Sequence, residues 1–543
     1  KKDDMKEVIL HYEDKYIPIE RKDTRMTLPM KKVATSQFHD YYEAQLQMHL
    51  ICLRYFFEFT DMQGEKVYYG NYEFDKECIT NRDRMFDCPQ NLREEEMFEV
   101  PQWAANKVVY QIFPSRFAAT QPVDKKLWYK APITPMDDLH GNLRGIIEHL
   151  DYIKDLGIDV VYLTPIFKSN SCHKYDTIDY YQVDPSFGTT EDLKELVQKS
   201  HERGMKVVLD AVYNHSGREF FAFQDILEKG EKSKYLDWYF IDELPPKSEW
   251  GEIPNFKCFG YYGGMPKLNL KNPEVEKYIT DVACYWIKEC DIDGWRLDVG
   301  DEISHFFWKN FRKAVKAVKK DMLIIGEIWH YAGDFLEGDE WDTVMNYPFY
   351  LNLIDLLADE KITVSQFVQN LGYLKGRLHK NCYPLMWNLI DSHDTARFLH
   401  LCNDNKKKQH LAAAFQLLLP GMPMIYYGDE YAMPGANDPD CRRGMYWDEE
   451  YQDKEMYEWY KRLIQVRKSH ACIVEGELAG SVTEDEEGTV VLIRKNGEET
   501  IAMIFNCSSS AKKFNEYTQK YNLLTENTFD GNVEGFDAAV IVL

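Results

Sequence analysis

The sequence predicts an α/β protein built around a (β/α)8 TIM barrel. It also predicts an inserted subdomain after the third strand, an N-terminal β-sandwich and a C-terminal antiparallel β domain. Between about residues 101 and 470, eight short apolar runs alternate with helix-length amphipathic segments, which is the pattern of a parallel barrel. Before and after that region, short β-type runs replace the helical repeats. At 543 residues, the chain is also too long for one ordinary hydrophobic core.

The first hundred residues show the composition of β structure. Residues 54–59 are rich in aromatic and β-forming residues, residues 61–64 have the composition of a turn, and residues 66–69 form a short run after it. Helical periodicity is poor throughout. We therefore predict a small β-sandwich over residues 1–100.

The barrel prediction depends on eight apolar runs and the helices between them. The helix before the fourth run can be predicted in detail, because Asn272 can cap it, Pro273 fits its first turn and Glu274 suits its positive end. Its buried stripe would be Val275, Tyr278, Ile279, Val282 and Trp286. The predicted strands are residues 108–113, 160–165, 207–212, 294–299, 323–328, 344–349, 385–390 and 424–427.

One interval between barrel elements is too long for a simple loop. Residues 213–270 are rich in aromatic residues, Gly and Pro, and show no helical repeat after about residue 228. We predict an inserted subdomain there, on the rim where barrel active sites lie. The barrel would then comprise residues 101–212 and 271–470. Residues 471–543 would form a C-terminal β-sandwich, with an Asn-Gly hairpin signal between residues 489–494 and 500–506.

Composition excludes several classes of function. With 65 basic and 90 acidic side chains the formal net charge is −25, which opposes binding to nucleic acid or to anionic membranes. No run reaches the ~20 apolar residues of a membrane helix, and no leader core follows the first residues. The twelve cysteines are scattered without a CxxC pair, which suits a reducing cytoplasm and small buried thiols. Because the sequence does not begin with Met, a removed leader stays open.

Polar residues stand where four of the apolar runs end. A single acidic residue there more often caps a loop, and a lone His is more often a core residue. Four such places at barrel spacing would instead converge on one pocket, where carboxylates raise one another's pKa and separate into acid and base. Acetal cleavage requires such a pair. The candidates are Asp210 and His215 in residues 210–215, Arg296 and Asp298 in 294–299, Glu327 in 326–329, and His393 and Asp394 in 391–394.

These segments resemble the α-amylase superfamily, glycoside hydrolase family 13. The four places stand where four signature regions of that family stand, in the same order. Residues 160–165 and 421–428 resemble two further family regions. Residues 265–269, Met-Pro-Lys-Leu-Asn, resemble the fifth region of the neopullulanase, cyclomaltodextrinase and maltogenic amylase branch. The predicted N-terminal sandwich resembles the carbohydrate-binding module of that branch, and the C-terminal β domain matches as well. The resemblance therefore covers nearly the whole chain, and it is weakest in the first hundred residues.

The resemblance implies a retaining glycosidase. Asp298 would be the nucleophile and Glu327 the general acid and then base, with their carboxyls about 5 Å apart. Asp394 would bind sugar hydroxyls in the cleaved subsite.

The resemblance also implies three substrate contacts and one residue that supports the nucleophile. His215 and His393 would hydrogen-bond hydroxyls, Arg296 would support Asp298, and Tyr175 would stack below the same sugar ring. We expect Asp210 to support the site without touching the reacting atoms.

Two departures from the family pattern argue against calcium, and we expect no cofactor. Where many α-amylases have a His that helps to bind calcium, this chain has Glu302. The calcium loop of the branch corresponds here to residues 117–124, which offer Asp124, two hydroxyl or amide groups and two lysines directly after them. We therefore expect Asn214, a calcium ligand in related enzymes, to be structural.

Three functions remain open at this point. The first is hydrolysis of α-1,4 links in cyclodextrins, maltooligosaccharides or pullulan, with some transglycosylation. The second is a sibling enzyme that transfers sugars or hydrolyses α-1,6 links. The third is a catalytically dead glucan-binding protein, which the presence of all three carboxylates disfavours. The branch often forms dimers, so a homodimer is a further expectation by analogy.

Overall fold

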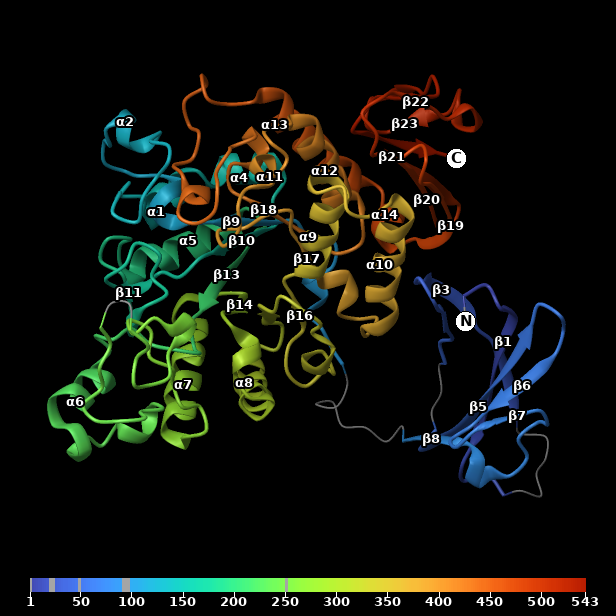
Figure 1. Cartoon of the computed structure of the whole chain (residues 1–543), viewed down its shortest axis with the longest axis horizontal. Coiled ribbons are helices and arrows are strands. Elements are labelled where there is room, and N and C mark those ends of the chain that lie inside the picture. Colours follow the sequence, from blue (N-terminus) through green and yellow to red (C-terminus); the bar gives the residue numbers. More distant parts are fainter. Residues whose placement is uncertain (1, 19–24, 47–49, 90–97, 250–251) are drawn as a thin grey trace. The chain divides into compact units, whose positions relative to one another are not determined.

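The computed structural model describes residues 2–18, 25–46, 50–89, 98–249 and 252–543 (Figure 1). They belong to two compact units, residues 1–98 with 363–379, and residues 99–362 with 380–543.

The first unit contains an antiparallel sheet in the order β2-β1-β5-β6-β7, with β8 paired to β5. The predicted strand at residues 54–59 is part of β5, and the one at residues 66–69 is β6. Phe56, Ile79 and Met85 form a small buried cluster in this unit. The strands are β1 (Met5–Asp14), β2 (Met26–Pro29), β5 (Cys52–Asp61), β6 (Lys66–Tyr69), β7 (Phe74–Asp75) and β8 (Phe86–Pro89).

A hairpin of β3 (Lys31–Thr35) and β4 (Asp40–Glu43) completes this unit, together with helix α10 (Val364–Arg377). The helix lies close against the hairpin at Gly372, where a Cβ atom would stand 2.0 Å from the carbonyl oxygen of Thr35. Only a glycine allows a helix to approach a strand backbone so closely.

The second unit is built on an eight-stranded parallel sheet in the order β16-β15-β14-β13-β10-β9-β18-β17. A parallel bridge between Met345 and Trp387 joins the two ends of that order, so the sheet closes into a barrel. This confirms the predicted fold class. The strands are β9 (Val109–Ile112), β10 (Val160–Leu163), β13 (Lys206–Ala211), β14 (Gly294–Leu297), β15 (Leu323–Gly326), β16 (Thr343–Val344), β17 (Trp387–Asn388) and β18 (Met422–Tyr426).

Helices follow the barrel strands as predicted. In α7 the Asn272 side chain accepts a hydrogen bond from the backbone N–H of Glu274 at 2.8 Å, and Val275, Ile279, Val282 and Trp286 are buried. No helix within the described ranges combines the length and apolar character needed to cross a membrane. The helices of this unit are α1 (Pro114–Phe117), α2 (Lys125–Trp128), α3 (Leu143–Glu148), α4 (Leu150–Leu156), α5 (Thr190–Glu202), α6 (Phe221–Lys229), α7 (Pro273–Cys290), α8 (His305–Val318), α9 (Tyr347–Leu353), α11 (Phe398–Leu401), α12 (Lys406–Leu418), α13 (Lys454–Ser469) and α14 (Cys472–Glu475).

The sixth predicted strand is wrong over most of its length. The strand β16 ends at Val344, and helix α9 begins at Tyr347. The Asn346 side chain accepts a hydrogen bond from the backbone N–H of Phe349, and Pro348 stands in the first turn. A cap and a proline at these positions start a helix, and they outweigh the β propensity of the surrounding residues.

The chain between β13 and α7 is largely irregular, as the sequence predicts. Helix α6 ends at Lys229, and the described residues between it and α7 contain only single 3₁₀ turns. Isolated bridges hold this segment together, among them Tyr239 with Leu268 and Ile241 with Phe256. A further insertion between barrel elements was not predicted. The strands β11 (Phe167–Ser169) and β12 (Thr177–Val183) form an antiparallel hairpin after β10.

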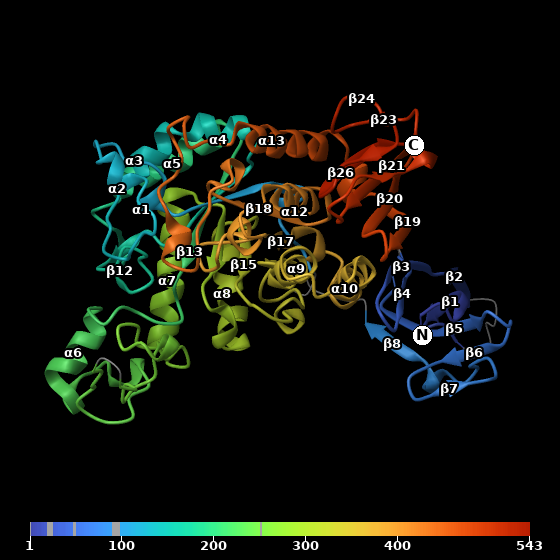
Figure 2. The same cartoon turned by 45° about the horizontal axis from the view of Figure 1, so that its top comes forward.

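The last part of the chain is an antiparallel sheet in the order β19-β20-β21-β26-β23-β24. The predicted hairpin is confirmed, with a two-residue loop in which Gly497 has a φ of +60°. Phe505 of this sheet stacks on Phe415 of α12, with ring centroids 4.2 Å apart. The ribbon of α12 lies beside this sheet in Figure 2. The strands are β19 (Glu477–Glu484), β20 (Thr489–Asn496), β21 (Glu499–Asn506), β23 (Tyr521–Asn522), β24 (Asn527–Thr528) and β26 (Asp537–Val542), and β22 (Lys512–Lys513) pairs separately with β25 (Asn532–Val533).

Candidate active site

The carboxyl ends of the barrel strands bring the predicted acidic residues together around one arginine. Arg296, on β14, is completely buried, and its Nη1 atom lies 2.8 Å from Oδ1 of Asp298. Its Nη2 atom lies 2.8 Å from Oε1 of Glu327 and 4.0 Å from Oδ2 of Asp394. Asp210 of β13 lies 3.3 Å from Nη1. One guanidinium thus contacts carboxylates from four strand ends.

The cluster contains more carboxyl groups than the single positive charge of Arg296 can neutralise. Burial raises the pKa of Asp298 well above its ordinary value, and the Arg296 guanidinium opposes that rise. Burial likewise raises the pKa of Asp210 to about 6, again against the pull of Arg296. Because one cation faces several carboxyls, the cluster favours a mixture of charged and protonated groups. Such a mixture is what acid and base catalysis by paired carboxyls requires.

A cavity of about 540 Å³ opens over these residues. Six predicted residues contribute to the site: Asp298, Glu327, Asp394, Tyr175 and His215 line the cavity, and His393 is buried beside it. Arg296 and Asp210 lie beneath the lining. The other lining residues are His173, Phe259, Met265, Val299, Asp301, Glu302, Trp329, Asp438 and Arg442.

Tyr175 reaches the cavity from the turn of the β11–β12 hairpin. Its hydroxyl lies 3.1 Å from Oδ2 of Asp210 and 2.5 Å from Nε2 of His393, and its ring is parallel to the His393 ring. Tyr162 of β10 also donates to Asp210 Oδ2, at 2.6 Å. Two tyrosine hydroxyls therefore fix the orientation of Asp210, which matches the expected supporting position.

The turn that carries Tyr175 is anchored by a buried ion pair. Lys174 adopts a left-handed conformation (φ +65°), and its Nζ lies 2.9 Å from Oδ2 of Asp184. Asp184 also accepts from the backbone N–H of Ser169 and from Ser186. Burial acts to raise the pKa of Asp184, but the hydrogen bonds from Ser186 and Lys174 hold it below its ordinary value. The ion pair therefore stabilises the fold at neutral pH and loses this effect as the pH falls.

Replacing Lys174 by Met should destabilise the protein strongly, because the substitution leaves a buried carboxylate without its cation. We expect the free energy of unfolding to fall by about 3–5 kcal/mol, measured by chemical denaturation. Lys277→Met is the matched control, since Lys277 forms an exposed pair with Asp281 at 2.6 Å and such pairs contribute about 0–1 kcal/mol. Equal losses in both variants would contradict the assignment of the effect to burial.

The two predicted histidines are neutral. Burial lowers the pKa of His215 to about 3. Its Nε2 lies 3.1 Å from the carbonyl oxygen of Tyr175 and therefore donates, which leaves Nδ1 as an acceptor with no partner among the described residues. Burial, Arg442 and Arg296 together hold the pKa of His393 well below its ordinary value. A sugar hydroxyl can donate to the open Nδ1 of His215.

Glu327 is oriented by a strained residue. The backbone N–H of Val299 donates to Oε2 of Glu327 at 3.0 Å, and Val299 has a φ of +47°. A β-branched residue at positive φ is a genuine outlier, and here it turns an N–H toward the carboxylate. The Trp329 indole lies over the Tyr347 ring at 3.9 Å and borders the same cavity.

Several lining residues were not predicted as site residues. Arg442 donates from Nε to the His393 carbonyl oxygen at 2.8 Å, and its Nη2 lies 3.3 Å from Oδ1 of Asp394. Asp438 pairs with Arg442 at 2.7 Å. Phe259 stacks on His215 with ring centroids 5.2 Å apart. These residues lie on loops without a periodic pattern, so the only signal in the sequence was their charge or aromatic character.

The residues discussed for calcium have other partners here. The Lys267 ammonium donates to Oδ1 of Asn214 and lies 3.0 Å from Oε2 of Glu302, so both oxygens already face a cation. The Asp124 side chain caps α2 by accepting from the backbone N–H of Lys126 at 2.9 Å. Within the described ranges, no three His, Cys, Asp or Glu side chains gather as a metal ion requires. A divalent ion at Asn214 would have to displace the lysine.

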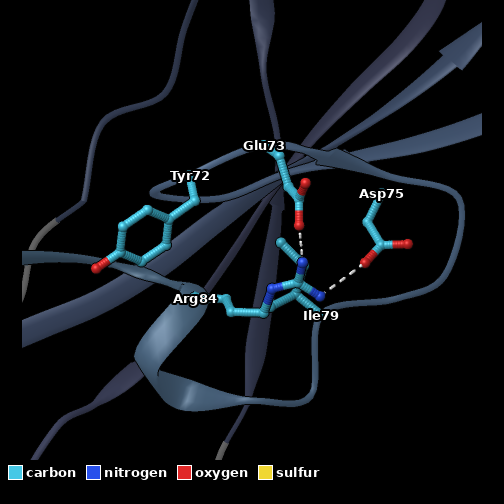
Figure 3. A pocket seen from close by; sticks show the side chains of 5 residues that line it. All are labelled: Tyr72, Glu73, Asp75, Ile79 and Arg84. Atoms are coloured by element: carbon cyan, nitrogen blue, oxygen red, sulfur yellow. Dashed lines mark hydrogen bonds and ion pairs between the residues drawn. The ribbon is translucent and has the colours of Figure 1, made fainter.

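A second, much smaller pocket lies in the first unit (Figure 3). Its volume is about 10 Å³, enough for one water molecule and too small for a sugar ring. Arg84 lies between Asp75, at 3.1 Å, and Glu73, while Tyr72 stands at its rim (Figure 3). We therefore place the chemistry in the barrel cavity.

The chain is similar to several known proteins over most of its length. The family model described as "Alpha amylase, catalytic domain" matches residues 111–476, and "Alpha amylase, N-terminal ig-like domain" matches residues 1–90. The chain is 43% identical to a cyclomaltodextrinase of Geobacillus thermopakistaniensis (strain MAS1), over 94% of this chain and 87% of the relative. It is 40% identical to neopullulanase 2 of Thermoactinomyces vulgaris, over 88% and 81% of the two chains. A solved structure of a cyclomaltodextrinase superposes with a TM-score of 0.94 at 38% identity, covering 100% of this chain and 95% of that one.

Proposed function

This chain belongs to the α-amylase family of glycoside hydrolases, in the cyclomaltodextrinase, maltogenic amylase and neopullulanase branch, and from that premise we propose a retaining mechanism carried by Asp298 and Glu327. Its activity is hydrolysis of α-glucans. The bonds we assign to it are α-1,4 links in cyclodextrins, maltooligosaccharides and pullulan. The single observation that supports these roles is the shared guanidinium, with Arg296 2.8 Å from both carboxyls.

In the first step the Asp298 carboxylate attacks the anomeric carbon while Glu327 protonates the glycosidic oxygen. The bond from the anomeric carbon to that oxygen breaks, and an ester to Asp298 forms. The freed oxygen takes the proton from Glu327 and becomes a hydroxyl, which belongs to the departing chain of a linear glucan or to the other end of an opened cyclodextrin ring. Burial disfavours the charged form of Asp298, and Arg296, 2.8 Å away, opposes that effect and stabilises the carboxylate that performs the attack.

In the second step Glu327, now ionised, takes a proton from water. The resulting oxygen attacks the anomeric carbon and displaces Asp298, so two inversions restore the α configuration. Asp394, with only 29% of its side chain exposed, would hold hydroxyls of the same ring. An acceptor sugar can replace the water, which gives transglycosylation.

The stereochemistry and the products test this proposal together. We expect the first product of β-cyclodextrin hydrolysis, observed by ¹H NMR, to be the α anomer, and pullulan to yield panose. A first product in the β configuration would overturn the retaining mechanism. Absence of any reaction with β-cyclodextrin, pullulan and starch would instead support a glucan-binding protein. Main products longer than the substrate, with little net release of reducing sugar, would favour the transferase alternative.

We also propose a location and an assembly state for this chain. A 40% identical relative in Bacillus subtilis is named intracellular maltogenic amylase, and we propose the cytoplasm for this chain. Burial raises the pKa of Cys290, Cys402 and Cys441 to about 12, which fits inert core thiols. Fractionation of the native host tests this location. A homodimer is proposed by analogy alone, and a single monomeric species in sedimentation velocity would rule it out.

A further inference from the structure

One polar side chain inside the barrel has no place in the mechanism above. Gln111 lies in β9, within an otherwise apolar run, and is completely buried. Its Nε2 atom lies 2.7 Å from Nδ1 of His393, and its Oε1 atom has no partner among the described residues. A buried amide costs free energy unless its hydrogen bonds compensate. The hydrogen bond to His393 is therefore the interaction that compensates for burying the Gln111 amide.

The other nitrogen of His393 decides which atom carries the proton. Nε2 lies 3.1 Å from Oδ2 of Asp394 and 2.5 Å from the Tyr175 hydroxyl. A carboxylate can only accept, so a lone pair on Nε2 would face the Asp394 oxygen with repulsion. Nε2 must therefore carry the proton. Because the ring is neutral, Nδ1 carries none and accepts from the Gln111 amide.

With this tautomer, each hydrogen bond in the cluster has one donor and one acceptor. Gln111 donates to Nδ1 of His393, and Nε2–H of His393 donates toward Asp394. The Tyr175 hydroxyl is then free to donate to Oδ2 of Asp210 at 3.1 Å. The opposite tautomer would leave an unprotonated Nε2 between a carboxylate and a hydroxyl, and would turn the Tyr175 proton away from Asp210.

We propose that Gln111 is a positioning residue that fixes the Nε2–H tautomer of His393, and thereby orients Asp394 and Tyr175 around the bound sugar. Gln111 acts through His393 and touches no substrate atom. The inference rests on the proposed function only in assuming that Asp394 and Tyr175 hold the reacting ring.

The direct test is the tautomer of His393 in the full-length, ligand-free protein. Selective ¹⁵N-histidine labelling, with His393→Gln to assign the signals, should show a protonated Nε2 and an unprotonated Nδ1. A protonated Nδ1 in the wild type would overturn the proposal whatever the variants do. This measurement needs no substrate, so it is independent of the catalytic roles of Asp298 and Glu327.

Two substitutions at Gln111 give distinguishable results. Gln111→Met removes the donor and should lower kcat on the order of 10- to 100-fold at every pH, with a mixed tautomer signature. Gln111→Glu can donate only while its carboxyl is protonated, so kcat should fall toward that of Gln111→Met as the pH rises through the pKa of that carboxyl. A merely structural role would not produce this added titration.

Gln416→Met is the matched control. Gln416 is equally buried, and it donates to the carbonyl oxygens of Asn388 and Met424 outside the cavity. We expect this variant to keep both kcat and the His393 signature. Equal kcat losses in Gln111→Met and Gln416→Met, with the His393 tautomer unchanged in both, would overturn the positioning role.

Discussion

Asp298→Asn should reduce kcat on β-cyclodextrin by at least about 10⁴-fold, the order of loss seen when a catalytic nucleophile is removed. An amide cannot form the ester intermediate, and no other described carboxylate pairs with Arg296 at the same nitrogen as closely. The substitution keeps the size of the side chain, so the thermal midpoint should change little by comparison. The measurement is kcat from reducing-sugar release, with the midpoint recorded on the same preparation.

Asp210→Asn is the informative comparison for that result. Asp210 is as deeply buried and also contacts Arg296, at 3.3 Å, but it does not line the cavity. Its loss should remove support for Tyr162, Tyr175 and Arg296 and lower kcat about 10- to 100-fold. If the two variants lost equal activity, general damage to the cluster would explain both, and Asp298 would lose its special role.

Much of this site could be predicted from sequence because strand ends follow a simple rule. In a parallel barrel the carboxyl ends of all strands meet at one rim, so acids such as Asp298 and Glu327 at successive run ends had to converge. The apolar runs themselves were sufficient to locate all eight strands. The sixth was predicted too long, although Asn346 and Pro348 already carried the signal of a helix start.

The remaining site residues depend on contacts that no local pattern encodes. Arg442 stands on an irregular loop after β18, where its position is set by hydrogen bonds to the backbone of His393 and to Asp394. Tyr175 was predicted from the resemblance, but the hairpin that presents it also depends on the buried pair of Lys174 with Asp184, which no periodic pattern in the sequence indicates. Gln111 was visible as one polar residue in an apolar run, yet its partner lies 282 positions away.

Glu327→Gln should lower kcat on β-cyclodextrin by about 10²- to 10⁴-fold, the contribution expected of a general acid and base. The amide is nearly isosteric and can still accept from the Val299 N–H, which lies 3.0 Å from Oε2 in the wild type. It can neither protonate the leaving oxygen nor deprotonate water. The measurement is kcat from reducing-sugar release, compared with the wild type at the same pH.

A substrate with a good leaving group separates the two roles of Glu327. The fluoride ion of α-maltosyl fluoride leaves without needing a proton, so Glu327→Gln should still form the maltosyl ester to Asp298. The variant should then stall, because no base is present to deprotonate the attacking water. Azide is already anionic and needs no base, so adding it should restore turnover and yield the α-maltosyl azide. Asp298→Asn, lacking the ester, should gain nothing from azide by this route. The result that would contradict this has two parts: azide restores turnover in neither variant, and Glu327→Gln still consumes the fluoride at the wild-type rate. Glu327 would then have no role in the second step.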